Sequence, residues 1–253
     1  MEEKILNGKK HGMATLLICV AVIILAIAGM IAGAAGASET EAPSALFFVS
    51  LVVLLVAWIP LAGLRVLKPQ EALVLTLFGK YIGTLKGEGF YAVNPFCSSV
   101  NPAADTKLNQ SGDVKTVATA PVGASADGVT VNFGKVPNKK ISLKIMTLNN
   151  NRQKINDCLG NPVEIGIAVT WRVVDTAKAA FNVDNYKEYL SLQCDSALRN
   201  IVRIYPYDVA PGIDTTGDGV ADEGSLRGSS EVVARRIKDE IQSRVNDAGI
   251  EIV

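Results

Sequence analysis

The stretch PVEIGIAVTWRVVDTAKAAF, residues 162–181, decides the fold class of this chain. From Val163 to Val173, apolar side chains occupy every second position, which is the pattern of a strand with one buried face. Asp175 follows, and an aspartate in front of TAKAAF is typical of a helix N-cap. A half-buried strand that leads into a short helix predicts a mixed α+β domain.

Two longer helices are expected after this stretch. Asp184 is a second capping residue, and apolar residues recur at helical spacing from there to about Ile204. Residues 231–248 predict the other helix, with Gly249 as its stop signal. The final GIEIV looks like the beginning of a strand. Because a domain rarely stops at such a point, we expect this one to continue beyond Val253.

The segment before residue 100 predicts short antiparallel strands. QEALVLTLFG, KYIGTL and GFYAVNPF are apolar runs divided by glycines, as in a meander of adjacent strands. A phosphate-binding loop is excluded, because Val74 and Tyr81 stand where such a loop needs a glycine and a serine or threonine. The glycines at the predicted turns are Gly79, Gly83, Gly87 and Gly89.

Composition and motifs exclude several classes of function. The chain has 25 acidic and 25 basic residues, which argues against a nucleic-acid-binding surface. The only histidine, His11, lies beside an apolar run, so the folded domain has no histidine for a catalytic triad or a zinc site. The four cysteines form no CxxC pair and are expected to be free thiols. No GxSxG or SxxK motif indicates a hydrolase.

Two apolar runs, 13–37 and 45–64, are each long enough to cross a bilayer. Only the acidic linker 38–44 separates them. We therefore predict a transmembrane helical hairpin whose helices approach closely at Gly29 and Gly33. An alternative takes the first run as a secretory signal, because lysines precede it and an A-x-A sequence ends it. The length of this run, and the second run directly after it, favour the anchor.

The charges beside the hairpin predict its orientation. Lysine and arginine are concentrated on the cytoplasmic side of membrane proteins, and the linker carries only the acidic Glu39 and Glu41. Residues 1–12 and the domain from residue 65 onward are therefore expected in the cytoplasm. The basic residues that flank the hairpin are Lys4, Lys9, Lys10, Arg65 and Lys68.

The order of the segments after the hairpin resembles the stomatin, prohibitin and flotillin superfamily, whose shared module is the SPFH or Band 7 domain. The resemblance lies in VLKPQEALVLTLFGKYIGT, GEGFYAVNPF, NDCLGNPVEIGIAVTWRVVDTAKAAFNVDNY, and ALRNIVRIYPYD with SLRG. It covers about residues 65–253 and implies a mixed-sheet SPFH domain with packed helices. Two features depart from the family pattern: the insertion at 118–140 is long, and this sequence lacks the helical coiled coil that normally follows the domain.

The resemblance implies a membrane-anchored scaffold. Proteins of this family assemble into large homo- or hetero-oligomeric rings or cages, and they organise membrane microdomains or restrain partner membrane proteins. We therefore expect the lipid bilayer and further copies of this chain as partners, with no cofactor and no catalytic residue. The alternative is a regulatory subunit that binds and controls a membrane protease or channel.

Aromatic residues beside the hairpin are candidates for the membrane interface. Trp58 lies near the exit of the second apolar run, where an indole sits among lipid headgroups. Phe90, Tyr91 and Phe96 lie in the strand segments that follow and are candidates to dip into the interface. The alternative, that these three fill the core of the domain, accounts for the sequence equally well.

Two charged faces are candidates for contacts between copies of the chain. The polar side of the strand at 162–173 and the charged side of the last helix carry both signs, which a head-to-tail contact in a ring can use to fix its register. Plain solvated surface accounts for any single one of these charges. The candidates are Glu164, Thr170 and Arg172 on the strand and Arg235, Arg236, Lys238, Asp239 and Glu240 on the helix.

The loop at 214–225 has part of the pattern of a calcium-binding EF-hand loop. Its candidate ligands Asp214, Thr216, Asp218 and Asp222 surround a glycine turn, but Ser225 stands where the bidentate glutamate belongs. A solvated acidic loop accounts for the same residues, so no metal site is assigned.

Overall fold

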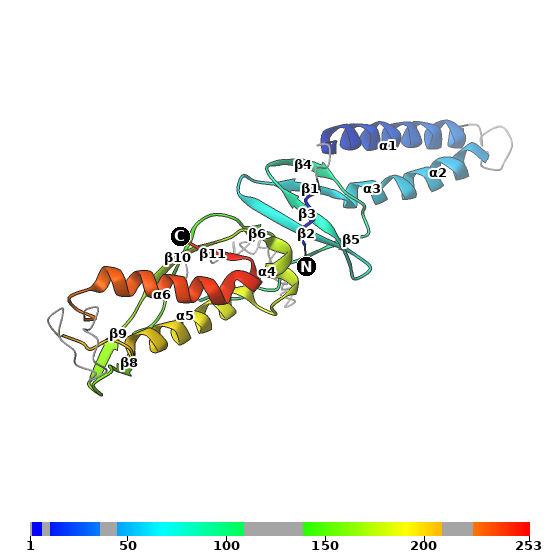
Figure 1. Ribbon diagram of the computed structural model, residues 1–253. Helices are drawn as coiled ribbons and strands as arrows, with labels where there is room; N and C mark the ends of the chain where they lie inside the picture. Colours follow the sequence, from blue (N-terminus) through cyan, green and yellow to red (C-terminus); the bar gives the residue numbers. More distant parts are fainter. Residues whose placement is uncertain (1, 7–10, 36–44, 109–138, 209–224) are drawn as a thin grey trace, which may run out of the picture. The chain divides into compact units, whose positions relative to one another are not determined.

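The computed structural model describes residues 2–6, 11–35, 45–108, 139–208 and 225–253 (Figure 1). The chain forms two compact units. The N-terminal unit is Lys4–Val100, and the C-terminal unit is Asn101–Val253 together with Met1–Glu3. Of the insertion at 118–140, only the last two residues are among those described.

Three helices open the N-terminal unit: α1 (Gly12–Ala35), α2 (Ala45–Ala57) and α3 (Ile59–Ala62). They form from the two apolar runs, and α1 and α2 lie side by side (Figure 1). The second run is interrupted at Trp58, and Pro60 lies in the first turn of α3, where its missing N–H leaves no helical hydrogen bond unmade. The chain is already extended at Leu64, where the first strand begins.

Short strands complete the N-terminal unit: β1 (Leu64–Leu67), β2 (Glu71–Leu77), β3 (Lys80–Lys86), β4 (Gly89–Ala92) and β5 (Cys97–Val100). β2 lies between β3 and β5, while β4 pairs with β1, all antiparallel. The predicted meander is therefore wrong at β4, which leaves β3 after a turn at Gly87, where φ is 99°. Gly83 lies inside β3 and not at a turn.

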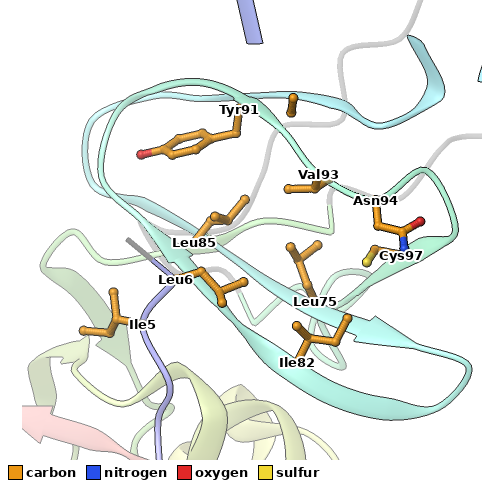
Figure 2. A pocket seen from close by; sticks show the side chains of 10 residues that line it. Ile5, Leu6, Leu75, Ile82, Leu85, Tyr91, Val93, Asn94 and Cys97 are labelled. Carbon is orange, nitrogen blue, oxygen red and sulfur yellow. The ribbon is translucent and has the colours of Figure 1, made fainter. Parts of the chain in front are cut away.

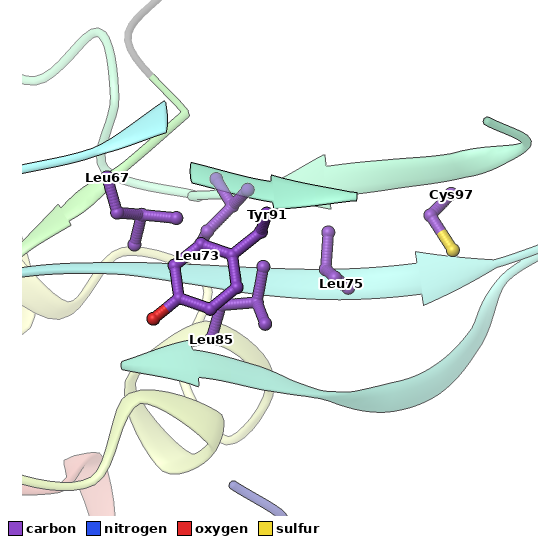
Figure 3. Packing of buried hydrophobic residues seen from close by; sticks show 6 residues of the cluster. All are labelled: Leu67, Leu73, Leu75, Leu85, Tyr91 and Cys97. Carbon is purple, nitrogen blue, oxygen red and sulfur yellow. The ribbon is translucent and has the colours of Figure 1, made fainter. Parts of the chain in front are cut away.

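A small apolar core stabilises the strands of the N-terminal unit (Figure 3). β2 is buried over most of its length, so the strand follows the continuous apolar run ALVL and does not alternate. Burying one leucine side chain is worth about 2 kcal/mol. The buried cluster consists of Leu67, Leu73, Leu75, Leu85, Tyr91 and Cys97.

The C-terminal unit contains an antiparallel sheet in the order β11–β10–β7. Val169, Trp171 and Val173 are buried on one face of the central strand, as the alternation predicted. The terminal GIEIV does form a strand, and it pairs with this central strand. The strands are β7 (Met146–Asn149), β10 (Ala168–Val173) and β11 (Ile250–Ile252).

The strand predicted at 162–173 is in fact two strands. β9 (Pro162–Ile165) forms a separate hairpin with β8 (Gln153–Asn156), and β10 begins only at Ala168. Gly166 lies between them, where an added Cβ would be 3.2 Å from Arg152 Cγ, so the chain changes partners at a glycine. The two-residue strand β6 (Ile141–Ser142) precedes β7.

The helices of the C-terminal unit begin at capping residues. Asp175 caps the first one as predicted, because its side chain accepts hydrogen bonds from two backbone N–H groups. The second is capped by Asn185 and not by the predicted Asp184. The helices are α4 (Thr176–Phe181), α5 (Tyr186–Val202), α6 (Ser230–Val245) and the 3-10 turn η2 (Asn246–Ala248).

α5 and α6 lie side by side (Figure 1). Each presents an apolar stripe at helical spacing to the interior. Gly249 ends the helical segment with φ of 66°, and an added Cβ would be 2.3 Å from Asp175 O, so a larger residue does not fit there. The buried residues include Leu190, Cys194, Ala197, Leu198 and Ile201 in α5 and Val233, Ile237, Ile241 and Val245 in α6.

Candidate membrane and assembly surfaces

The surfaces of α1 and α2 are apolar and exposed. Leu25 is 71% exposed and Leu55 is 67% exposed, and neither helix contains a charged residue. A helix that is apolar on all sides belongs in a protein core or in hydrocarbon, and these side chains are not in a core. Two segments, Gly12–Ala34 and Ala45–Ala62, are long and apolar enough to cross a membrane.

α1 and α2 approach closely at the two expected glycines. An added Cβ on Gly33 would lie 2.7 Å from Phe47 N, and one on Gly29 would lie 2.6 Å from Ser50 Oγ. At Gly33 the neighbouring atom is backbone, so a larger side chain does not fit there, whereas at Gly29 it is the end of a serine side chain. Small residues at such contacts are typical of helices that pack within a membrane.

The start of α1 and the end of α3 contact the strand pair β1–β4 and the residue that follows it. Gly12 opens α1, and an added Cβ there would be 2.7 Å from Phe90 Cγ. Gly63 follows α3, and its carbonyl oxygen accepts a hydrogen bond from Val93 N at 3.0 Å. The strands therefore begin at the end of the apolar helices, without a linker between them.

The segment before α1 pairs with β3. Leu6 N donates to Thr84 O at 2.9 Å, and Thr84 N donates to Lys4 O at 2.8 Å, which forms a parallel bridge at Ile5. Gly83 permits this contact, because an added Cβ would lie 2.6 Å from Leu6 Cγ. The sequence did not predict the pairing, since two apolar residues among polar neighbours are too few for a strand pattern.

The four aromatic candidates for the membrane interface lie in different environments. Trp58 is 63% exposed and Phe96 is 64% exposed. Phe90 is half-buried against the start of α1. Tyr91 is a core residue whose hydroxyl donates to Gly87 O at 3.3 Å, so the core alternative holds for Tyr91 and the interface prediction does not.

Phe78 is an exposed aromatic residue that the sequence analysis missed. It is 88% exposed, and its φ of 49° is unusual for a bulky side chain. Leu77 pairs with Cys97, so Phe78 and Phe96 flank the same end of the β2–β5 pair. The available signal was a phenylalanine placed directly before the turn glycine Gly79, where polar residues are usual.

On the polar face of β10, two of the candidate contact residues bond to other residues of the same chain. Arg172 Nε lies 2.6 Å from Glu251 Oε2 across the β10–β11 pair. This hydrogen bond, with the attraction of the two charges, raises the pKa of Arg172 and lowers that of Glu251. Thr170 Oγ1 donates to Val253 O at 3.1 Å, while Glu164 is exposed on β9.

The charged side of α6 is more open. Arg235, Lys238 and Asp239 are exposed, and Arg235 lies 3.8 Å from Glu231, a long contact in which both side chains stay solvated. Arg236 is exposed and lies over the Tyr205 ring, 5.4 Å from its centroid. Glu240 is half-buried and holds Arg244 at 2.6 Å. Arg235, Lys238 and Asp239 are therefore the most open of the candidates on α6.

A buried carboxylate in the C-terminal unit has a structural role. Asp157 is 5% exposed and accepts hydrogen bonds from Leu159 N, Asn161 N, Asn161 Nδ2 and Tyr207 N. Burial raises the pKa of Asp157, but the hydrogen bonds from Asn161, Tyr207 and Leu159 outweigh it and leave the pKa below its ordinary value. The carboxylate thus joins the β8–β9 loop to the segment after α5.

The described residues contain no group of three or more His, Cys, Asp or Glu that could hold a metal ion. The calcium-loop candidates Asp214, Thr216, Asp218 and Asp222 lie outside the described residues. All four cysteines are free thiols. Burial, with the nearby charge of Asp195, raises the pKa of the Cys194 thiol to about 12, so this thiol stays protonated at neutral pH.

A comparison with protein families identifies the part of the chain after the apolar helices. Residues 65–253 match the model of the SPFH domain / Band 7 family. The chain belongs to this family. Band 7 proteins are generally membrane-associated scaffolds without enzymatic activity. No match is found among curated proteins.

Proposed function

We propose that this Band 7 protein is a membrane-anchored scaffold that assembles from many copies and organises the bilayer around them. The observation that carries the proposal is that Lys4–Leu6, before the two exposed apolar helices, pair with β3, which follows them in the chain. A chain whose first residues and folded strands lie on one side of a bilayer crosses it an even number of times. α1 and α2 then form a hairpin that enters the membrane and returns.

The orientation of the hairpin follows from its flanking charges. Basic residues lie before α1 and after α3, and the linker between the two apolar runs is acidic. The Band 7 domain and the N-terminal segment therefore face the cytoplasm. Trp58, Phe96 and Phe78 are exposed aromatic residues suited to the headgroup region of that leaflet.

We propose that the scaffold acts by presenting the same surface on many assembled copies and not by catalysing a reaction. A scaffold of this kind needs a contact that each copy makes with the next, and a closed ring satisfies that need with one head-to-tail interface. The charged side of α6, with Arg235 and Lys238 exposed, is the surface that we assign to this contact.

Cysteine labelling in intact cells tests the anchor. Thr40→Cys places a thiol in the linker, and Glu231→Cys places one on the exposed start of α6, where the glutamate side chain is 91% exposed. A membrane-impermeant maleimide should modify the first and modify the second only after the cells are opened. Labelling of Glu231→Cys in intact cells would place the Band 7 domain outside and overturn the proposed orientation.

A further inference from the structure

The N-terminal unit contains an apolar cavity of 590 Å³ that is partly open to the surface (Figure 2). Its walls come from β2, β3, the end of β4 and the N-terminal segment. Figure 2 shows Leu6, Leu75, Ile82, Leu85 and Val93 around it. None of the described residues that line the cavity is charged, and Asn94 supplies the only amide among them. The volume lies within the range of small-molecule sites, about 300–1,000 Å³.

Two polar side-chain atoms of the lining, Tyr91 Oη and Asn94 Oδ1, are engaged within the chain. Tyr91 Oη donates to Gly87 O at 3.3 Å, and Asn94 Oδ1 accepts a hydrogen bond from Phe96 N at 3.0 Å. A peptide or a sugar in this cavity would leave most of its own polar groups unpaired, because the lining is otherwise mainly apolar, and this is costly. The lining therefore fits a hydrocarbon chain.

The cavity lies beside the residues that directly follow α3, the last of the apolar helices. Val93, one of its lining residues, donates its N–H to Gly63 O directly after α3. Ala92, another lining residue, pairs with Leu64 at the start of β1. With the hairpin in a bilayer, a hydrocarbon chain has a short path from the cytoplasmic leaflet to this cavity.

The N-terminal segment forms one wall of the cavity. Ile5 and Leu6 line the cavity, and their segment is bound to β3 by two backbone hydrogen bonds at Thr84 and by Lys4 N, which donates to Tyr81 Oη at 3.3 Å. Ile5 is 50% exposed, so this wall reaches the surface of the unit. We place the entry for a hydrocarbon chain at this exposed wall, where the polar headgroup can stay in the interface.

We propose that this cavity binds one acyl chain of a bilayer phospholipid. The inference rests on the proposed membrane anchor, because the anchor brings the cavity to the leaflet. Binding then ties each copy of the scaffold to a lipid of its own leaflet. The hydrophobic effect of each buried methylene supplies the affinity.

Photo-crosslinking of the full-length protein tests the proposal. The protein is reconstituted in vesicles of phosphatidylcholine and phosphatidylglycerol that contain a phosphatidylcholine with a diazirine at the end of one acyl chain. Mass spectrometry after irradiation locates the label. A parallel sample receives palmitic acid that carries the same diazirine in place of the labelled phospholipid.

Two variants fill the cavity, and one is a matched control. Ile82→Trp and Val93→Trp each add an indole at a lining position, whereas Val66→Trp adds one at an exposed position of β1 that does not line the cavity. We expect phospholipid label on β2 and β3 residues of the cavity. Each filling variant should lower it about tenfold, because an indole occupies the space of several methylene groups. Val66→Trp should leave it unchanged.

The results separate this inference from the proposed function. Label on α1 and α2 without label in the cavity would overturn the inference and leave the anchor intact. Cavity label from palmitic acid alone would overturn the phospholipid as its source. Cavity label that both filling variants leave unchanged, with circular dichroism like that of the control, would also overturn the site. Absence of label from α1 and α2 would contradict the anchor itself.

Discussion

Single residues hold the C-terminal unit together where regular structure ends. The Asp157 carboxylate accepts four hydrogen bonds and connects the β8–β9 loop to Tyr207. Its position was not predicted, although DCLGN contains an aspartate that can bond to its own turn and a glycine, Gly160, with φ of 86°. Asp175 and Gly249 were predicted, because a cap and a stop are local features, whereas the Tyr207 contact joins residues far apart in the sequence.

Replacing Asp157 should loosen this part of the molecule. Asp157→Ala leaves three backbone N–H groups without their acceptor, and at about 1 kcal/mol for each lost hydrogen bond this costs about 3 kcal/mol in local stability. Hydrogen exchange at Leu159, Asn161 and Tyr207 should accelerate about a hundredfold. Asn182→Ala, which removes a single hydrogen bond from an exposed residue to Asp247 O, is the control and should leave these amides unchanged. Equal exchange in Asp157→Ala and the unaltered protein would refute this role.

The lowered pKa of Asp157 predicts a pH dependence. A carboxyl whose pKa is lower in the folded state stabilises the fold above its unfolded pKa, about 3.9, and this contribution is lost as pH falls through the folded pKa. The unfolding temperature of the unaltered protein should therefore exceed that of Asp157→Asn by a constant amount near neutral pH. The gap should narrow below about pH 4. A gap that widens in acid would contradict the assigned direction.

At the scale of elements, the periodic patterns predicted which helices and strands exist better than they predicted which strands pair with one another. The buried stripes of α5 and α6 and the alternation in β10 follow directly from apolar spacing. The pairing of β4 with β1 was not predictable, because neighbouring strands in the sequence usually pair and no local residue states otherwise. The division of residues 162–173 into β9 and β10 at Gly166 was not predictable, because the apolar alternation in the sequence continues across this glycine.

The contact between α1 and α2 depends on Gly33. Gly33→Leu places a side chain where a Cβ alone would be 2.7 Å from Phe47 N, so the helices must separate. Such overpacking costs about 1–3 kcal/mol. Circular dichroism at 222 nm in detergent should show a lower melting temperature for the helices. Ile31→Leu, at a position 63% exposed on α1, is the control. Equal melting of Gly33→Leu and the control would show that the helices do not depend on this contact.

The charged side of α6 is the element that we expect to join copies. Reversing Arg235 and Arg236 to Glu removes two rim contacts and introduces repulsion, which should weaken assembly about tenfold or more. Analytical ultracentrifugation should show smaller particles, while circular dichroism stays unchanged. Because Arg236 also packs on Tyr205, Lys238→Glu tests the same face without that contact.

The control for this surface reverses charges elsewhere on the C-terminal unit. Arg152 and Arg203 are both exposed and lie outside α6, so their double reversal to Glu changes net charge by the same amount. Particles of unaltered size are expected. If this control shrinks the particles as much as the α6 variants do, net charge and not the α6 surface governs assembly.

At the scale of the whole molecule, the family resemblance identified the domain. The structure added the contact between the N-terminal segment and that domain. Residues 65–253 match the Band 7 family, as the sequence segments indicated. The pairing of Lys4–Leu6 with β3 and the cavity beside it depend on contacts between residues 70 or more positions apart, which apolar periodicity does not report. Together these features are the basis for the proposed hairpin anchor, the proposed lipid site and the proposed assembly surface.

The size of the purified assembly tests the scaffold most directly. The full-length protein, solubilised in detergent and purified alone, is examined by native mass spectrometry and sedimentation velocity. A scaffold predicts one closed species of many identical subunits that persists on dilution. A monomer or dimer at all concentrations would contradict the scaffold, and large particles that form only with a second protein would instead favour a regulatory subunit.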